Sequence, residues 1–365
     1  MRRRLVILTP HDLELGAGGV ERFTRVLAPL MRERGWDTDV FWPLPGDRAV
    51  PGPVEKIGAA VVVAARRVAR RHRRAIAAAD AVLANGPMGW SVRHPNLVTV
   101  FHANFAGYAE AVKPTVSRAE YVRLRHVQGG AMALAAARGA GVEVSRQNAR
   151  EVTRYYGVRR VAVIENGIEP GSFAGGDAQR ARRRHGLPDG RLVLFPGRVE
   201  YRKGEDALRA LPALLPPDAT LVVAGPRALD QPGAVDLGPQ GPDELRDLYA
   251  AASVGLMPTR FEGCSYSLME AQDAGLPVVT NRQGHVADML EREPALAPAV
   301  ASSLDPAELA GRVRLFLDDP GAARRVAEAG VRYVRRHHDA REMADRYDAL
   351  LRGAGAWRRG DGAAR

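Results

Sequence analysis

The chain has 365 residues, enough for two domains of ordinary size. Hydrophobic residues make up 46% and charged residues 26%, which excludes a disordered or fibrous chain. No apolar run approaches the ~20 residues that a membrane-spanning helix needs. The apolar stretch after the basic N-terminus, Leu5 to Leu8, is too short for a signal peptide, and Cys264 has no second cysteine with which to form a disulfide. We therefore expect a soluble, cytoplasmic α/β protein.

The formal net charge is +11, which permits binding to nucleic acid, anionic lipid or an anionic ligand. Only three of the 53 basic residues are lysines (Lys56, Lys113 and Lys203), and alanine is abundant. This bias is typical of a GC-rich coding sequence, and we favour that explanation of the charge over a functional one.

The first half of the chain alternates predicted strands and helices. A continuous apolar run at 5–8 is typical of a strand covered on both faces, and a glycine loop and a helix over 20–34 follow it, ending at Gly35. Ser145 is a predicted N-cap for a helix that reaches Tyr156. The predicted strands of this half are 5–8, 38–42, 81–84, 97–101, 141–144 and 161–164. Such a βαβ pattern predicts a parallel sheet.

The alternation restarts after a linker region over 170–190, which contains a short basic helix from Gln179 to His185. The strands predicted after it are 192–195, 221–224, 255–257 and 277–280, and the last ~60 residues are predicted to be helical. The chain is therefore predicted to contain two successive doubly wound Rossmann-like domains and a helical tail.

Ligands bind such sheets at the carboxyl ends of the strands, so the loops there are the candidate sites. Arg198 follows the strand at 192–195, and Lys203 lies five residues later, before a helix that begins near Glu205. Two cations at a strand end are suited to a diphosphate. Two surface charges without a ligand remain an equal alternative.

Two carboxylates flank a run of small residues after the strand at 255–257. Glu262 lies in the loop, and Glu270 lies on the helix that begins near Ser267. Ionised carboxylates accept hydrogen bonds, and ribose or hexose hydroxyls donate them. The segment is therefore suited to a hydroxyl-rich ligand, although a carboxylate near a helix start is also common without one.

Taken in order, these motifs resemble the retaining glycosyltransferases of family four. The matching segments are Gly18-Gly19-Val20-Glu21-Arg22, Asn166-Gly167-Ile168, Gly197-Arg198-Val199-Glu200, Lys203-Gly204, Glu262-Gly263 through Glu270-Ala271, and Gly275 through Val279. Each segment alone is weak evidence for the family, whereas the ordered set is specific to it.

The resemblance implies the GT-B fold, an α/β architecture of two Rossmann-like domains that face each other across a cleft. It implies an acceptor-binding domain over 1–168 and a nucleotide-sugar-binding domain over 169–340. It also implies a C-terminal helix over 341–365 that packs back on the first domain.

The implied activity is transfer of a hexose-type sugar from a nucleoside diphosphate sugar, with UDP favoured over GDP, to a hydroxyl of a small molecule or glycan. Anomeric configuration would be retained, and the nucleotide sugar would be a co-substrate, with no other cofactor. Arg198 and Lys203 would bind the diphosphate and stabilise the leaving group, and His102 would contact the donor sugar. The other implied donor contacts are Gly18, Gly19, Leu237, Glu262, Gly263, Cys264, Ser265, Tyr266 and Glu270.

The chain departs from many relatives at Cys264-Ser265, where they carry Phe-Gly after the first Glu-Gly, so the hexose preference is open. No acidic cluster in the sequence is typical of a divalent-metal site, and we predict a metal-independent enzyme in which the two cations replace the metal. Acceptor-binding candidates lie in the loops of the first domain: His11, Asp12, Glu14, Asn85 and Asn104. They are equally compatible with ordinary loop positions.

A basic helical run from Arg66 to Arg74 is compatible with anionic lipid or with a solvated helix face, and we favour the solvated face because the run has no Trp or Phe anchors. Three other functions remain open: a membrane-surface glycolipid glycosyltransferase, a sugar phosphorylase or epimerase, and a non-enzymatic nucleotide or nucleic-acid binder. Nucleic acid is disfavoured because aromatics are only 6% and do not cluster with the arginines.

Overall fold

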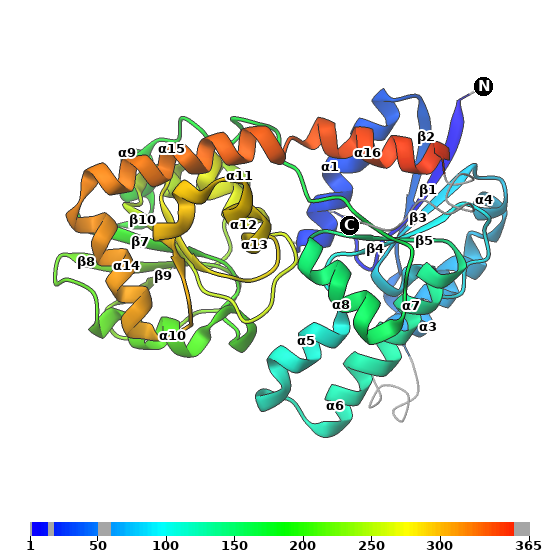
Figure 1. The fold of residues 1–365 in the computed structure, drawn as a ribbon, viewed down its shortest axis with the longest axis horizontal. Helices are drawn as coiled ribbons and strands as arrows, with labels where there is room; N and C mark the ends of the chain where they lie inside the picture. Colours follow the sequence, from blue (N-terminus) through cyan, green and yellow to red (C-terminus); the bar gives the residue numbers. More distant parts are fainter. Residues whose placement is uncertain (1, 14–17, 50–59, 354–365) are drawn as a thin grey trace. The chain divides into compact units, whose positions relative to one another are not determined.

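The computed structural model describes residues 2–13, 18–49 and 60–353. The chain divides into two compact units. Unit 1 contains the residues up to Asn166 together with the segment that begins at Ala340, and unit 2 contains Gly167–Asp339. Each unit is built around its own six-stranded sheet (Figure 1).

The sheet of unit 1 has the order β2-β1-β3-β4-β5-β6, and every neighbouring pair is parallel. Its strands are β1 (Arg3–Leu8), β2 (Trp36–Phe41), β3 (Ala81–Asn85), β4 (Leu97–Phe101), β5 (Ala140–Glu143) and β6 (Val161–Val163). The six predicted strands are confirmed to within two residues at each end. Leu5 to Leu8 are at most 1% exposed, because both faces of β1 are covered, as the continuous apolar run predicts.

Helices and short helical turns surround this sheet. They are α1 (Gly19–Glu33), η1 (Pro45–Arg48), α3 (Ala60–Arg71), α4 (Arg73–Ala77), η2 (Gly86–Gly89), α5 (Phe105–Val112), η3 (Lys113–Thr115), α6 (Arg118–Val122), the π-helical η4 (Arg123–Gln128), α7 (Gly129–Arg138), α8 (Arg146–Tyr156) and α16 (Ala340–Gly353). The predicted caps are present. Gly35, with φ +85°, follows α1, and the Ser145 hydroxyl accepts the Asn148 N–H at 3.2 Å at the start of α8.

The last described helix, α16, packs against α1 of unit 1 (Figure 1). The rings of Phe23 and Tyr347 meet edge to face, with centroids 5.4 Å apart. The indole N–H of the buried Trp36 donates to the Asp348 carboxylate at 2.6 Å, and Arg34 pairs with Asp345 at 2.7 Å. An apolar contact and two polar contacts therefore attach the C-terminal helix to the first unit.

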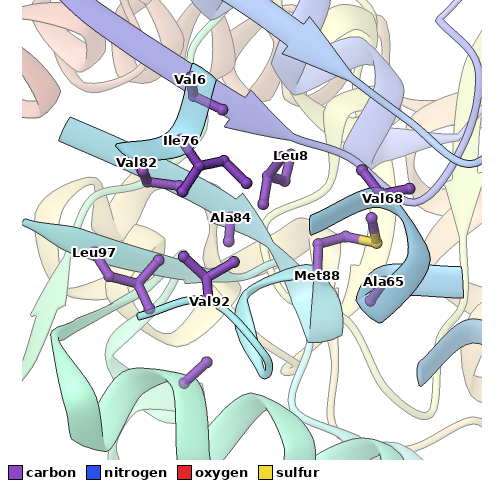
Figure 2. Packing of buried hydrophobic residues seen from close by; sticks show 11 residues of the cluster. Val6, Leu8, Ala65, Val68, Ile76, Val82, Ala84, Met88, Val92 and Leu97 are labelled. Carbon is purple, nitrogen blue, oxygen red and sulfur yellow. The ribbon is translucent and has the colours of Figure 1, made fainter. Parts of the chain in front are cut away.

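A buried apolar cluster fills the space between the sheet of unit 1 and the helices over one of its faces (Figure 2). Strand residues such as Leu8 and Val82 meet Val68 of α3 and Met88 of η2, and all four are fully buried. Burying a side chain of this size contributes about 1.5–3 kcal/mol to the free energy of unfolding. The cluster therefore fixes α3 and η2 against β1 and β3.

The basic run over 66–74 is helical, as predicted, except at His72 between α3 and α4, and part of it holds η1. The Arg67 guanidinium donates to the backbone carbonyls of Gly46, Asp47 and Ala49 at 3.1, 2.9 and 2.8 Å. Arg71 is hydrogen-bonded to the Asp47 carboxylate, and this bond holds the pKa of Asp47 below its ordinary value. Two of the arginines therefore have a structural role, while Arg66, Arg70, Arg73 and Arg74 are exposed.

The sheet of unit 2 has the order β12-β11-β10-β7-β8-β9, again with parallel neighbours. Its strands are β7 (Arg191–Pro196), β8 (Ala219–Ala224), β9 (Ala234–Asp236), β10 (Val254–Met257), β11 (Val278–Asn281) and β12 (Val300–Ala301). The chain adds β8 and β9 on one side of β7 and then returns to place β10 on the other side. The strand order therefore reverses between β7 and β10, and ligands bind doubly wound sheets at such a switch point.

The four predicted strands of this half are confirmed, and β9 and β12, of three and two residues, were not predicted. The helical elements are α9 (Ala178–His185), η5 (Tyr201–Lys203), α10 (Glu205–Ala210), η6 (Leu211–Ala213), α11 (Pro242–Ala251), α12 (Tyr266–Asp273), α13 (Val286–Arg292), η7 (Pro294–Ala299), α14 (Pro306–Asp318) and α15 (Pro320–His337). Helices α10 and α14 lie on one side of the sheet, and α11, α12 and α15 lie on the other (Figure 1). Across the described ranges, no helix has the length and apolar character needed to cross a bilayer.

Candidate functional site

The two loops at the switch point of unit 2 bring together three charged side chains. Lys203 and Arg202 come from the loop after β7, and Glu262 comes from the loop after β10. The Lys203 ammonium donates directly to Glu262 Oε2, and a terminal guanidinium nitrogen of Arg202 lies 3.8 Å from the same oxygen. The three side chains are only 18–24% exposed, so their charges interact through a partly dehydrated environment.

This environment keeps Glu262 ionised. Burial by itself raises the pKa of the Glu262 carboxyl, but the positive charges of Lys203 and Arg202 outweigh burial. Together with hydrogen bonds from Lys203 and from the Gly263 N–H, they lower that pKa to about 2. The carboxylate is therefore an obligate hydrogen-bond acceptor at every pH at which the protein would be assayed.

Two glycines allow the loops to approach each other. Gly204 has φ +71°, and a Cβ there would lie 2.9 Å from Pro258 Cβ, so the turn between Lys203 and α10 requires glycine. Gly284, with φ +58°, lies directly under the Glu262 loop, where a Cβ would come within 2.3 Å of the Gly263 carbonyl. Both contacts fix the position of the loop that carries Glu262.

The loop after β10 is also fixed by hydrogen bonds to its neighbours. The Asn281 side chain at the end of β11 accepts the Thr259 N–H and donates to the Thr259 carbonyl, both at 2.8 Å. The Arg260 N–H donates to the Arg202 carbonyl at 2.7 Å. Backbone and amide contacts therefore position both loops without any ligand.

The small residues predicted to contact the donor continue from Glu262 into α12. Gly263 and Cys264 are buried, and the Ser265 hydroxyl accepts the Leu268 N–H at 3.4 Å as the N-cap of the helix. Tyr266 is 7% exposed and begins α12. Glu270 is 1% exposed, and its Oε2 accepts a hydrogen bond from the Tyr249 hydroxyl of α11 at 3.1 Å.

Arg198 and Leu237 follow the ends of β7 and β9. Arg198 is exposed, and it has no ion pair with any part of the chain that the structure describes. Leu237 is half-buried, and its carbonyl accepts the Gln240 side-chain amide at 2.9 Å. An exposed guanidinium beside the Lys203 loop is available to an anion.

His102 at the end of β4 belongs to a hydrogen-bonded chain in unit 1. The Thr24 hydroxyl donates to the Val20 carbonyl at 3.0 Å, so its oxygen must accept from the Asn85 amide nitrogen at 3.1 Å. The Asn85 carbonyl oxygen then faces His102 Nε2 at 2.8 Å, which places the ring hydrogen on Nε2. Burial lowers the pKa of His102 to about 3, so the ring is neutral, and its buried Nδ1 accepts no hydrogen bond from the described residues.

The structure gives the other candidates in unit 1 different surroundings. Gly18 and Gly19 stand at the start of α1. Arg48 donates to His11 Nδ1 at 2.7 Å, and Asp12 is half-buried, whereas Glu14 lies outside the described residues. Asn104 is fully buried: its side chain caps α5 through the Gly107 N–H at 2.6 Å and donates to Glu151 at 2.7 Å.

Within the described ranges, no three His, Cys, Asp or Glu side chains come together in a way that would hold a metal ion. The contacts at the candidate site that the sequence did not indicate are those of Arg202 and Tyr249. Arginine is too common in this chain for Arg202 to stand out, and no spacing rule connects Tyr249 with Glu270.

Both halves of the chain match models of known protein families. A family model described as "Glycosyltransferase Family 4" matches residues 17–171, and one described as "Glycosyl transferases group 1" matches residues 190–319. The chain belongs to glycosyltransferase family four. The second match contains Arg198, Lys203, Glu262 and Glu270, so the proposed donor residues lie inside a family segment.

Curated relatives of this family-four chain include the D-inositol 3-phosphate glycosyltransferase of Acidothermus cellulolyticus, 34% identical over 222 residues. That match covers 52% of this chain and 48% of the relative. The glycogen synthase of Mycobacterium tuberculosis is 32% identical over 200 residues, which are 49% of this chain and 45% of the relative. The chain therefore spans about half the length of the curated relatives that it matches.

Among solved structures, sucrose-phosphate synthase from Thermosynechococcus elongatus superposes with a TM-score of 0.78 and 20% identity, covering 97% of this chain and 100% of that one. HepE of Anabaena, solved with UDP-glucose, gives a TM-score of 0.72 at 17% identity, with 96% and 99% covered. These likenesses confirm the predicted GT-B fold class.

Proposed function

We propose that the chain is a retaining glycosyltransferase that moves a hexose-type sugar from a nucleoside diphosphate sugar to a hydroxyl of a small molecule or glycan. The observation that carries the proposal is the meeting of a cationic loop and a carboxylate loop at the switch point of unit 2. The cations are suited to the diphosphate, and Glu262, which is ionised, is suited to the hydroxyls of the sugar.

The donor is proposed to be a UDP-sugar in preference to a GDP-sugar. Support comes from the relative HepE, which was solved in complexes with UDP-glucose and with UDP. Glu270, held by Tyr249, would accept hydrogen bonds from the ribose hydroxyls, and the segment over 263–266 would offer backbone groups to the sugar. The neutral His102 would accept a sugar hydroxyl at Nδ1.

In the proposed step, the bond between the anomeric carbon and the β-phosphate oxygen breaks, and the acceptor oxygen bonds to that carbon on the same face. The acceptor proton passes to the departing phosphate oxygen. Negative charge grows on that phosphate as the bond breaks, and fixed cations stabilise it. We propose that Arg198 and Lys203 supply this charge, so that catalysis needs no divalent metal.

The test is release of nucleoside diphosphate from a panel of UDP-, GDP- and ADP-sugars, with and without sugar and polyol acceptors. We expect turnover with a UDP-sugar and its loss in Arg198→Ala. Arg183→Ala is the matched control, because Arg183 is an exposed arginine of α9 in the same unit. Wild-type protein that cleaves none of the donors, with or without acceptors, would contradict the proposal.

A further inference from the structure

Arg202 is placed between the two loops of the switch point and contacts both. Its Nε and one terminal nitrogen donate to Glu200 Oε1 at 3.0 and 2.6 Å. The other terminal nitrogen donates to the Phe261 carbonyl at 3.3 Å and lies 3.8 Å from Glu262 Oε2. The guanidinium thus joins a carboxylate of the β7 loop to the backbone and the carboxylate of the β10 loop.

The same Glu262 oxygen is bonded to Lys203, which the proposed function assigns to the diphosphate. An ammonium is a compact point charge, and a diphosphate carries more negative charge than a carboxylate. When Lys203 turns to the diphosphate, its attraction to Glu262 weakens. Leaving a carboxylate that is only 18% exposed without a cation is costly, because breaking a largely buried ion pair leaves an uncompensated charge.

We propose that Arg202 is a positioning residue for the donor: it keeps Glu262 ionised and oriented toward the sugar while Lys203 binds the diphosphate. This inference rests on the proposed function. Arg202 acts through Glu262, and Glu200 holds Arg202 in place.

The geometry favours arginine over lysine at this position. A guanidinium presents five N–H donors in a rigid fork, so it can hold Glu200 with one edge and face Phe261 and Glu262 with the other. Lysine has one nitrogen and cannot span both loops. Arg202→Lys therefore retains the charge near Glu262 but loses the link between the loops.

The pH dependence of turnover distinguishes this role from that of a residue that only stabilises the two loops. The pH profile of kcat reports groups in the complex with substrate, and that of kcat/KM reports groups in the free enzyme. The charged groups that lower the pKa of Glu262 are Lys203 and Arg202, and from the loop after β11 the His285 backbone N–H donates to the Gly263 carbonyl at 2.9 Å. In Arg202→Met, Lys203 still lowers the pKa of Glu262 in the free enzyme. In the complex with the donor, Lys203 binds the diphosphate instead.

The experiment measures kcat and kcat/KM for cleavage of the UDP-sugar from pH 4 to 8, and the affinities for UDP and for the intact UDP-sugar. Glu262 is ionised across this pH range in the wild type. In Arg202→Met, we expect its titration in the substrate complex to enter the range and to give the kcat profile an acid limb, while the kcat/KM profile stays as in the wild type. Affinity for UDP should fall, because UDP also engages Lys203. Affinity for the UDP-sugar should fall further, by about tenfold or more, because Glu262 also accepts hydrogen bonds from the sugar. Arg202→Lys should keep the kcat profile near that of the wild type, and Glu200→Gln should shift it in the same direction as Arg202→Met. Arg183→Met is the control for loss of an exposed arginine.

Three results would overturn the inference. The first is a pH profile of kcat that is the same as the wild type in Arg202→Met and Glu200→Gln. The second is an equal loss of affinity for UDP and for the UDP-sugar in Arg202→Met. The third is a pH profile of kcat in Arg202→Lys that is shifted as far as that of Arg202→Met. If Arg202→Met does not fold, Glu200→Gln and Arg202→Lys carry the same comparison. If the wild-type protein cleaves no donor, the proposed function itself is wrong. If the wild type cleaves the donor and the variants have the wild-type pH profile of kcat, only the role of Arg202 is wrong.

Discussion

The Lys203–Glu262–Arg202 cluster should make the stability of unit 2 depend on pH in a predictable way. A free Glu titrates near pH 4.3, whereas the pKa of Glu262 in the folded protein is about 2. One pH unit of pKa difference corresponds to about 1.36 kcal/mol, so ionised Glu262 contributes about 3 kcal/mol to the free energy of unfolding at neutral pH. Because the folded pKa is depressed, this contribution is present above pH ~4.3 and is lost as the pH falls toward 2.

We therefore expect Glu262→Gln to lower the free energy of unfolding of unit 2 by about 3 kcal/mol at pH 7, and by about half as much at pH 3. The four tryptophans (Trp36, Trp42, Trp90 and Trp357) all lie outside Gly167–Asp339. Urea unfolding followed by far-UV circular dichroism reports both units, whereas tryptophan fluorescence reports residues outside unit 2. The control is Glu328→Gln, an exposed carboxylate of α15. A Glu262→Gln penalty of the same size at pH 7 and pH 3 would refute the reasoning.

Four further outcomes are expected. Tyr249→Phe should lower the free energy of unfolding by about 1.5–3 kcal/mol and raise the KM for the donor, because it removes the hydroxyl bonded to Glu270. An unchanged free energy of unfolding and an unchanged donor KM would contradict this. Arg67→Ala should destabilise unit 1 by about 1–3 kcal/mol in fluorescence-detected unfolding, whereas Arg66→Ala, at an exposed position, should change it by less than about 0.5 kcal/mol. Turnover should survive EDTA, and chelator inhibition that Mg²⁺ or Mn²⁺ reverses would show a metal requirement. Arg198→Ala should lower kcat about 10²–10³-fold, and a change in KM alone would show that Arg198 only holds the donor.

Strands such as β1 and β7 could be predicted from the sequence because they contain continuous apolar runs. Leu5 to Leu8 and Leu192 to Phe195 are buried on both faces, so every residue in them had to be apolar. The strands β9 and β12 were missed because each offers only two consecutive apolar residues, whereas β6, also of three residues, continues an apolar run that reaches Ile164. Their place at the two edges of the sheet of unit 2 comes from pairing with β8 and β11, which a local pattern does not contain.

For the candidate site, the sequence indicated the right loops but not the contacts between them. Lys203 and Glu262 are 59 residues apart, and their pairing depends on β10 lying beside β7, a consequence of the strand order. The chain from Thr24 through Asn85 to His102 likewise joins three elements. Loop candidates such as Asn104 were chosen by residue type alone, and the structure shows its amide engaged in a helix cap.

Calorimetric titration of UDP and uridine into wild-type and Arg198→Ala protein tests most directly whether the loops at the switch point of unit 2 bind a diphosphate. Charge-assisted hydrogen bonds contribute about 1.5–3 kcal/mol each, which is about a 10–100-fold change in affinity. We expect the wild type to bind UDP far more tightly than uridine, and Arg198→Ala to lose at least tenfold in UDP affinity while uridine binding is unchanged. Equal affinities of UDP for the two proteins, or of UDP and uridine for the wild type, would contradict a diphosphate site at Arg198.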